Sequence, residues 1–432
     1  MTKHYYTLLL MLLVFSTGCK KEDSRQHLSG SAMTIARFLP ETGGATTEIL
    51  ITGTNFAADT SQVTVTINGK RCVVINTGMN QLMAIVPKRC GSGKVVVRVG
   101  NDSIVSKDIF NYIFTRTVTT IAGNGKAGYA NGKGSEAMFN FNGEGWYRGA
   151  GIVADDDLNV YVTDVGNHCI RKIDSAGNVT LLAGNPDASG YADGKGKSAK
   201  FSLPYGITID AQSNLYTVDP GNWDIRKITP DGEATTIAWG KSEPWFIATD
   251  KSTGQLYYTS ASPGATLYRV NADFSQTDVI TQLPKPGGIT FDQQGNLFIS
   301  CNDDHYIQKY SATSWTAAAV AGQKGIAGYA DGTAASAKFS APWSIAADVQ
   351  GNLYVAGNGN INAGANPDQS IRFISATDAA VSTYAGGGSA GFSNGMGQAA
   401  AFNGPLGITV DKNGTVYVLD KNNNAIRKII SE

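Results

Sequence analysis

Apolar residues occur in short runs along nearly the whole chain, and Gly, Asn and Asp separate these runs. The segment 151–173, GIVADDDLNVYVTDVGNHCIRKI, shows the usual order. A run that is apolar on both sides comes first, then an acid with a turn, a second run, and a third run with Arg and Lys. Short runs bounded by turn residues predict β-strands, so we expect an all-β protein.

The same unit begins six times, each time with Gly-Ile or a related dipeptide that an aspartate follows. These aspartates are Asp155, Asp210, Asp250, Asp292, Asp348 and Asp411. They lie 40 to 63 residues apart. One copy cannot bury its own apolar side, so the copies must pack against one another, and a period of about 40 residues plus insertions favours a β-propeller. The sequence predicts a six-bladed propeller over residues 115–432.

The ends of the repeat region predict how the ring closes. The sixth copy stops after its third strand, at Ile430, whereas a spare fourth strand, Thr117–Ala122, precedes the first copy. We expect this N-terminal strand to complete the sixth blade, so that no long strand edge stays exposed. Third strands such as Ile170–Ile173 alternate in polarity, so we expect one side of them to be wet.

These repeats resemble NHL repeats. Asp164–Ile173 is close to the pattern of that family, as is Asp420–Lys428, whereas Ser260–Tyr268 and Gly357–Arg372 depart from it most. The resemblance covers the whole repeat region and implies the propeller fold. It leaves the function open, because the family includes binding scaffolds and a few enzymes.

Residues 33–114 show a different pattern of short alternating runs, among them Glu48–Thr52 and Lys94–Val99, with a tight hairpin at Asn68-Gly69. This spacing predicts a small antiparallel sandwich. The stretches ITGTNF at 51–56 and VTVTING at 63–69 also resemble an IPT/TIG domain, which has an immunoglobulin-like fold. The resemblance implies a spacer or interaction module without catalytic residues.

Residues 1–18 have the features of a targeting segment. The apolar run Leu8–Phe15 is too short to span a membrane, and small residues follow it up to Cys19. The segment resembles a bacterial lipoprotein signal in which Cys19 becomes the lipidated N-terminus. Ser16 departs from the usual Leu, as lipoproteins of Bacteroidetes-like bacteria tolerate, and KKED at 20–23 resembles their signal for the outer surface. The alternative is a secreted protein with an incidental cysteine.

Residues 19–32 are polar and without periodicity, so they are expected to form a tether. The chain of 432 residues carries 35 basic and 35 acidic side chains, so no charge excess favours nucleic acid. The remaining cysteines form no CxxC pair, which argues against a zinc ribbon or a redox motif. Cys72 and Cys90 form either one disulfide or two buried thiols, and Cys169 and Cys301 are expected in the core.

A second pattern, Gly-Tyr/Phe-Ala/Ser-Asp/Asn-Gly, stands between several repeats, and we call it the linker element. Its four copies are residues 128–132, 190–194, 328–332 and 391–395. Asn-Gly and Asp-Gly predict tight turns, and we expect the aromatic residues to hold the element on its blade. A sugar-binding or ion-binding role for its aspartates is the alternative. The linkers before blades three and four lack it, so that sector of the face should be lower.

The residues that differ most between copies stand just before each inner strand. In propellers of this type these linkers, and the loops between second and third strands, open on one face. The aromatic and histidine residues at or near these positions are Tyr205, Trp245, Trp343, Trp146, Tyr147, His168, Trp223 and His305. Aromatic faces around a shallow cavity suit stacking on sugar rings. The alternative is that these side chains fill the channel, while Trp239 and Trp315 are expected to pack on the outer blades.

Catalysis finds little support in the residues. Related propellers include an amidating lyase and lactonases, and the lyase chemistry needs histidines clustered on a metal. His4 and His27 lie in the signal and the tether, whereas His168 and His305 lie three blades apart. The repeated aspartates are expected to cap turns, with a carboxylate-only calcium site as the alternative. We expect no catalytic residue, metal or cofactor.

The sequence thus favours a lipoprotein of the outer membrane that faces the cell exterior and binds a glycan through its propeller. It would touch the membrane through its lipid alone. A protein–protein scaffold with an outer-membrane partner is the first alternative and requires a broad apolar patch. A lyase or lactonase is the second.

Overall fold

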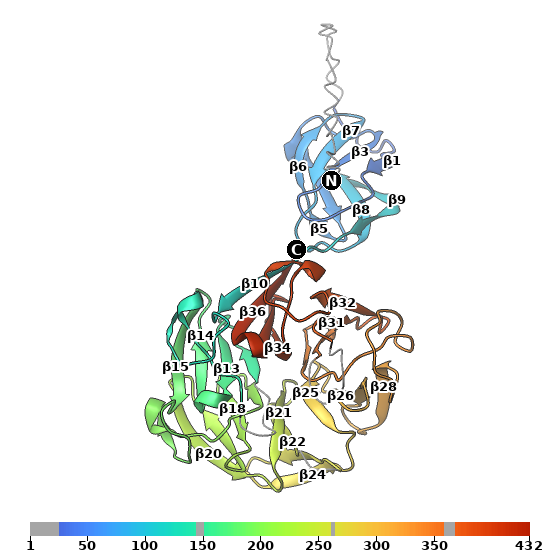
Figure 1. The fold of residues 1–432 in the computed structure, drawn as a ribbon. Helices are drawn as coiled ribbons and strands as arrows, with labels where there is room; N and C mark the ends of the chain where they lie inside the picture. The colour runs from blue at the N-terminus through green and yellow to red at the C-terminus, as the bar shows by residue number, and fades with distance from the viewer. Residues whose placement is uncertain (1–25, 144–150, 261–263, 358–367) are drawn as a thin grey trace, which may run out of the picture. The chain divides into compact units, whose positions relative to one another are not determined.

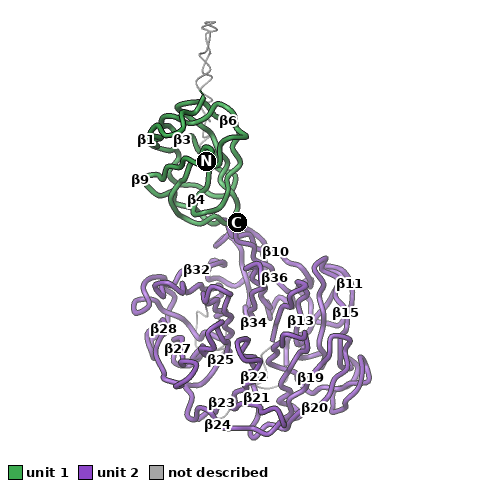
Figure 2. The backbone as a smooth tube through the Cα atoms, turned by 180° about the vertical axis from the view of Figure 1, so that it is seen from behind, with its two compact units in different colours: residues 1–114 green, residues 115–432 purple. Residues whose placement is uncertain are grey.

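The computed structural model describes residues 26–143, 151–260, 264–357 and 368–432, so Cys19, Trp146 and Tyr147 lie outside the described residues. The chain divides into two compact units, residues 1–114 and 115–432 (Figure 2). Both are built from β-strands. Within the described ranges there is no helix of the length and apolarity that crossing a membrane requires.

The first unit is a sandwich of two sheets, with the strand orders β1-β3-β7-β6 and β2-β9-β8-β4-β5. Its elements are β1 (Thr34–Leu39), β2 (Thr42–Gly43), β3 (Glu48–Thr54), the short helix η1 (Thr60–Gln62), β4 (Val63–Ile67), β5 (Lys70–Arg71), β6 (Val73–Thr77), β7 (Gln81–Ile85), β8 (Gly93–Val99) and β9 (Asp102–Tyr112). Asn68 and Gly69 have φ values of 47° and 77°, which confirms the predicted two-residue hairpin between β4 and β5.

Alternate side chains of both sheets form the sandwich core, which includes the buried Phe38, Ile51 and Phe110. Cys72 and Cys90 are two buried free thiols, and burial raises the pKa of the Cys72 thiol to about 12. Part of the predicted tether is attached to this unit. The His27 ring lies 2.9 Å from a carboxylate oxygen of Asp102, the first residue of β9, and 2.8 Å from the main-chain oxygen of Asn55.

The second unit is a ring of six blades, each with its first strand at the centre (Figure 1). Blades one to three contain β12 (Ile152–Ala154), β13 (Val160–Asp164), β14 (Cys169–Ile173) and β15 (Asn178–Gly184); β17 (Ile207–Ile209), β18 (Leu215–Asp219), β19 (Asp224–Ile228) and β20 (Glu233–Trp239); β21 (Pro244–Asp250), β22 (Gln255–Ser260), β23 (Leu267–Val270) and β24 (Gln276–Ile280). Blades four to six contain β25 (Pro286–Phe291), β26 (Leu297–Cys301), β27 (Tyr306–Tyr310) and β28 (Ala317–Gly322); β29 (Ile345–Ala347), β30 (Leu353–Ala356), β31 (Ile371–Ile374) and β32 (Val381–Ala385); β34 (Pro405–Val410), β35 (Val416–Asp420), β36 (Ala425–Ser431) and β10 (Arg116–Ala122).

The ring closes as the sequence predicts. β10, the first strand of the unit, lies antiparallel to β36, the last, with Thr117 opposite Ile430 and Val118 opposite Ile429. Val118 is fully buried in the core that blades five and six share. The two ends of the propeller chain thus form one continuous sheet.

Neighbouring inner strands approach each other closely where they begin. A Cβ atom on Gly151 would lie 2.7 Å from the main-chain oxygen of Tyr205, and one on Gly206 would lie 2.8 Å from that of Trp245. These distances are too short for any side chain, so the Gly-Ile start of the repeat reflects the narrow centre of the ring.

Each linker element runs to the outer edge of the blade that follows it. Three copies add a short fifth strand to the fourth strand of that blade: β11 (Gly132–Lys133), β16 (Gly194–Lys195) and β33 (Gly395–Met396). The other 3-10 helices lie in these linkers or after second strands: η2 (Gly134–Glu136), η3 (Val165–Asn167), η4 (Gly196–Ser198), η5 (Gly397–Ala399) and η6 (Lys421–Asn423). In blade five Gly332 bridges to Val381 instead.

One side of the third strands was predicted to face solvent, but the arginines of these strands are buried. Arg171, Arg226, Arg372 and Arg427 are fully buried beneath the linker elements. The guanidinium group of Arg171 donates to the main-chain oxygens of Ala130 and Met138, to Asn131 and to Asp164, at 2.7 to 3.1 Å. It also lies over the rings of Tyr129 and Phe139.

This contact explains the second pattern of the sequence. The Asp or Asn of each linker element accepts a hydrogen bond from the buried arginine, so all four copies share one contact that holds the linker on the blade. Blades three and four, whose linkers lack the element, carry Tyr268 and Gln308 at the position of the arginine.

We predict that Val118→Asp destabilises the propeller through its clasp strand. A carboxylate buried opposite Ile429 should lower the free energy of unfolding by about 3 kcal/mol or more. All six Trp residues belong to the propeller, so Trp fluorescence in a urea titration reports this unit alone. Thr119→Asp, at the exposed neighbouring position, is the control. Equal midpoints for the two variants would show that β10 does not hold the ring.

Candidate functional site

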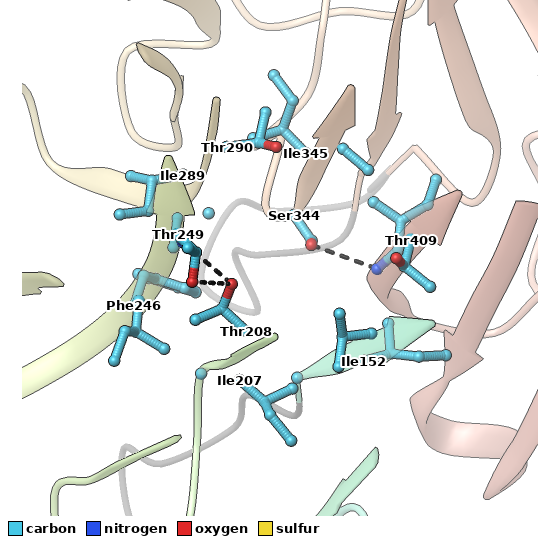
Figure 3. Close-up of a pocket in the computed structure, with 18 of the residues that line it drawn as sticks. Ile152, Ile207, Thr208, Phe246, Thr249, Ile289, Thr290, Ser344, Ile345 and Thr409 are labelled. Atoms are coloured by element: carbon cyan, nitrogen blue, oxygen red, sulfur yellow. Dashed lines mark hydrogen bonds between the residues drawn. The ribbon is translucent and has the colours of Figure 1, made fainter. Parts of the chain in front are cut away.

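The inner strands surround a central cavity of about 110 Å³. Figure 3 shows isoleucines from different blades around it, together with hydroxyl groups. The Thr208 and Thr249 hydroxyls are 3.2 Å apart, and the Ser344 hydroxyl accepts from the main-chain N–H of Ile408 at 3.3 Å. An apolar cavity that admits benzene has about 150 Å³, so this space holds a few waters and no sugar ring.

A cluster of aromatic side chains stands at the end of the channel where the inner strands begin, which we call the mouth. Trp245 is the second residue of β21, the inner strand of blade three, and Trp343 lies two residues before β29, the inner strand of blade five. Their ring centroids lie 6.4 Å apart. Blade four, which stands between them, carries Gly287 at the equivalent position, and a Cβ atom there would lie 2.5 Å from the main-chain oxygen of Trp343. Both indoles are partly exposed, and Phe246 contacts both, with centroids 6.4 and 5.6 Å away.

Tyr205 belongs to this cluster but is not exposed. A residue on the rim of an open pocket should be exposed, so Tyr205 does not line such a pocket. Its ring is fully buried against Trp245 and Phe246, with centroids 5.5 and 5.6 Å away. The ring belongs to the core cluster that includes Val218 of blade two and Phe246 of blade three, so Tyr205 fills space between these blades, which is the alternative interpretation. Burial raises the pKa of the Tyr205 phenol.

Two polar groups of the cluster are buried without a hydrogen-bond partner in the described part of the chain. They are the Tyr205 hydroxyl and the Trp245 indole N–H. A buried donor without an acceptor costs about 1 to 3 kcal/mol. Protein atoms cover the Tyr205 hydroxyl and the Trp245 N–H, so an ordered water, or a ligand after a small shift of the cluster, would supply the missing acceptor.

The residues from the loops between second and third strands play a different part. His168, Trp223, His305 and Asn424 hold equivalent turn positions with φ between 41° and 62°. The His305 Nδ1 accepts from the main-chain N–H of Ala341, and Asn424 accepts from that of Phe141. These side chains connect one blade to the linker of the next, so His305 serves the fold. His168 is half-buried at the same position, and Trp223 is 50% exposed.

The repeated aspartates lie at the opposite end of the inner strands and cap turns, as expected. The Asp155 carboxylate accepts from the main-chain N–H groups of Asp157 and Asn159 and from the Tyr161 hydroxyl, at 2.8 to 2.9 Å. The other five accept equivalent bonds from their own turns. Within the described ranges no three His, Cys, Asp or Glu side chains are grouped so that they could hold a metal ion.

Trp239 was expected to pack on the outer blades, and the structure corrects this. It is 54% exposed at the end of β20, beside the 49% exposed Tyr191. The sequence contains a signal for this site, because Trp239 stands where the fourth strands of four other blades continue into glycine. Trp315 is half-buried and contacts Tyr257, with ring centroids 5.7 Å apart, as expected.

A buried pair of carboxylates lies next to Trp239. Asp224 is opposite Trp239 on one side and opposite Asp219 on the other, and both acids are fully buried. Neither oxygen of Asp224 has a hydrogen-bond partner among the described residues, and its closest ion-pair contact is 3.8 Å, to Arg226 Nε. Burial raises the pKa of Asp224 to about 7, and burial together with Asp224 raises the pKa of Asp219 well above its usual value.

Known proteins share both parts of this chain. Residues 33–118 match the IPT/TIG domain, and residues 150–173 and 402–429 match the NHL repeat. The Arabidopsis thaliana chloroplast protein SUPPRESSOR OF QUENCHING 1 is 24% identical over 319 residues. This match covers 72% of the chain and 27% of that relative, so the chain spans well under half of the relative's length.

Solved structures from Bacteroides resemble the whole architecture. A protein of unknown function from Bacteroides thetaiotaomicron has a TM-score of 0.66 and 21% identity, with 94% of this chain and 100% of that chain covered. An auxiliary nutrient binding protein from the same species has a TM-score of 0.58 and 22% identity, and the match covers 94% of this chain and 99% of that chain. An auxiliary nutrient binding protein from Bacteroides ovatus has a TM-score of 0.57 and 21% identity, and the match covers 94% of this chain and 100% of that chain. At these identities the likeness shows the fold, and it agrees with the predicted combination of IPT/TIG domain and NHL propeller.

We predict that Asp224→Asn stabilises the propeller more at pH 8 than at pH 5. The pKa of Asp224 is higher in the folded state, so the native protein loses stability as the pH rises from about 4 through 7, where the buried carboxylate must ionise. Each unit of pKa shift corresponds to about 1.4 kcal/mol, so the rise from 3.8 to about 7 sets an upper limit of about 4 kcal/mol on the gain at pH 8. Melting temperatures at the two pH values test this. Asp187→Asn, at an exposed carboxylate, is the control, and an equal gain at both pH values would contradict the account.

Proposed function

We propose that this chain, an IPT/TIG domain joined to an NHL-repeat propeller, is a non-catalytic binding protein that takes a carbohydrate at the mouth of its channel. The observation that carries the proposal is the contact between Trp245 and Trp343 above the cavity. Both rings are partly exposed, and the buried donors of Tyr205 and Trp245 stand beside them without partners in the described structure.

Carbohydrate fits the chemistry of this cluster better than a wholly apolar or a charged ligand. A sugar ring offers an apolar C–H face for the indoles and hydroxyl oxygens for the Trp245 N–H. A wholly apolar ligand would leave this donor unpaired. The cavity below is smaller than a sugar ring, so the ligand should lie across the mouth. The fully buried Tyr205 would hold the Trp245 ring in place and would not touch the ligand.

Two further considerations support binding over catalysis. His305 and the repeated aspartates are engaged in turns and blade contacts, so the residue types that catalysis would use serve the fold. The names of two of the Bacteroides structures describe nutrient binding proteins. A carbohydrate is our choice of nutrient class, and it rests on the aromatic cluster.

A protein partner is the second candidate, and the sandwich favours it. On the outer side of one sheet, Leu39 and Leu50 are paired and are 45% and 37% exposed. On the edge strand β6, Val73 and Ile75 are 63% and 42% exposed. A photo-crosslinking residue at position 73 tests this surface in cells, and the absence of any crosslinked protein would contradict it.

We also propose that the protein is anchored by a lipid on Cys19 at the exterior side of the outer membrane. The support is the sequence alone: the short apolar run, the small residues before Cys19 and the charged residues after it. Such an anchor would hold the propeller where extracellular polysaccharide first meets the cell.

We predict that Trp343→Ala weakens polysaccharide binding by about tenfold or more, because one of the two stacking faces is lost. Affinity electrophoresis with a panel of polysaccharides, followed by calorimetry with the best of them, measures the change. Trp315→Ala is the matched control, since Trp315 is half-buried away from the mouth. Equal binding by Trp343→Ala and wild type would remove the main support for this site.

We predict that Cys19→Ala abolishes membrane attachment. Cells fed with a labelled fatty acid should transfer label to the wild-type protein and none to the variant, which should appear in the soluble fraction. Equal labelling of both proteins, or a wild type without label, would contradict the anchor.

A further inference from the structure

Blade two carries an aromatic pair at its outer edge, away from the mouth. Tyr191 of the linker element and Trp239 of β20 are 49% and 54% exposed, with ring centroids 5.2 Å apart and an interplanar angle of 41°. The linker elements of blades five and six also expose an aromatic ring, Tyr329 and Phe392. In those blades, however, the residue at the position of Trp239 is a glycine, so each exposed ring lacks this second aromatic partner.

An oriented carboxylate lies beside the pair. The Asp193 Oδ1 accepts from the Arg226 guanidinium, from the Thr236 main-chain N–H and from the Thr236 hydroxyl, at 2.9 to 3.0 Å. These three bonds fix the carboxyl group. Its side chain is 46% exposed, and no partner of its second oxygen, Oδ2, is found within the described residues. The site thus combines two ring faces with one fixed acceptor.

Three residues that differ from those of blade one lie together at this place. Trp223, Asp224 and Trp239 replace the His168, Cys169 and Gly184 of blade one, and Asp224 lies opposite Trp239 in the sheet. The main-chain N–H after Trp239 also donates to the Trp223 oxygen at 2.8 Å. The positions of Trp223 and Asp224 vary from blade to blade, whereas four other blades have glycine where blade two has Trp239. Trp239 therefore does not serve the packing that the blades share, and it points to a task specific to blade two.

We infer that Tyr191, Trp239 and Asp193 form a second binding site, which takes a neutral pyranose unit of a carbohydrate chain. The apolar face of the sugar would stack on the two rings, and a hydroxyl group would donate to the Asp193 Oδ2. The inference rests on the proposed function, because it assigns the same ligand class to a second place on the propeller.

The charge beneath the rings decides between a sugar and an organic cation, the other ligand that aromatic pairs commonly bind. The Arg226 guanidinium lies 5.5 Å from the centre of the Tyr191 ring and is fully buried there. This guanidinium pairs with the Asp193 carboxylate at 2.9 Å, so the two charges balance and leave no net negative charge that would favour a cation over a neutral sugar. The linker between β20 and β21 consists of residues 240–243 alone, so the rings stay uncovered.

The test uses variants that the fold already tolerates in other blades. Trp239→Gly introduces the glycine that four other blades have at this position. Asp193→Asn introduces the residue that blade one has there, Asn131, which accepts a hydrogen bond from the buried arginine of that blade. Tyr329→Ala, in the linker element of blade five, is the matched control. The probes are soluble starch, xylan, galactomannan and mixed-linkage β-glucan in affinity electrophoresis, with tetramethylammonium as the cationic probe in a fluorescence titration.

The expected result is that each blade-two variant binds the best polysaccharide about tenfold more weakly, while Tyr329→Ala binds as wild type does. If both variants bind like wild type while Trp343→Ala does not, the second site is refuted and the proposed function stands. If wild type binds none of the four polysaccharides, both are refuted. A saturable fluorescence change with tetramethylammonium that Trp239→Gly abolishes would overturn the choice of a neutral ligand.

Discussion

The propeller depends on a buried arginine that ties each long linker to its blade. In blades one, two, five and six the guanidinium group is fully buried, is sandwiched between aromatic rings, and donates to main-chain oxygens of the linker element. Loss of one partner from such a buried charged contact typically costs about 3 to 5 kcal/mol. The four contacts explain why Gly, Tyr or Phe, and Asp or Asn recur together in the linkers: these residues hold each linker on its blade.

Once these residues are assigned to the fold, the remaining differences between blades become informative. The mouth differs from the repeat at Trp245, Phe246 and Trp343, and the edge of blade two differs at Trp223, Asp224 and Trp239. Both places expose aromatic faces next to polar groups without partners in the described structure. Blades three and four, whose linkers lack the element, follow directly after Trp239.

The architecture could be predicted because the repeat is local and periodic. The six aspartates, the Gly-Ile starts and the spare strand at Thr117–Ala122 predicted six blades and their closure, and the hairpin at Asn68-Gly69 followed from turn chemistry alone. Side-chain exposure could not be predicted in the same way, because it depends on which blades approach each other. Tyr205 is buried because Trp245 and Phe246 of the next blade pack against its ring. The third-strand arginines are buried because the linker before each blade folds over them. Trp239 could have been found, because a Trp at a position that glycine usually holds has no packing role in the repeat.

The central claim is that the aromatic residues that break the repeat bind a carbohydrate. The indole N–H signals of the six Trp residues in a two-dimensional NMR spectrum test it most directly, during titration with an oligosaccharide cut from a polysaccharide that the protein retains. The account predicts saturable shifts for Trp245 and Trp343 at the mouth and for Trp239 at the edge of blade two, with Trp315 unchanged. Shifts confined to Trp315, or no shift at saturating ligand, would contradict it.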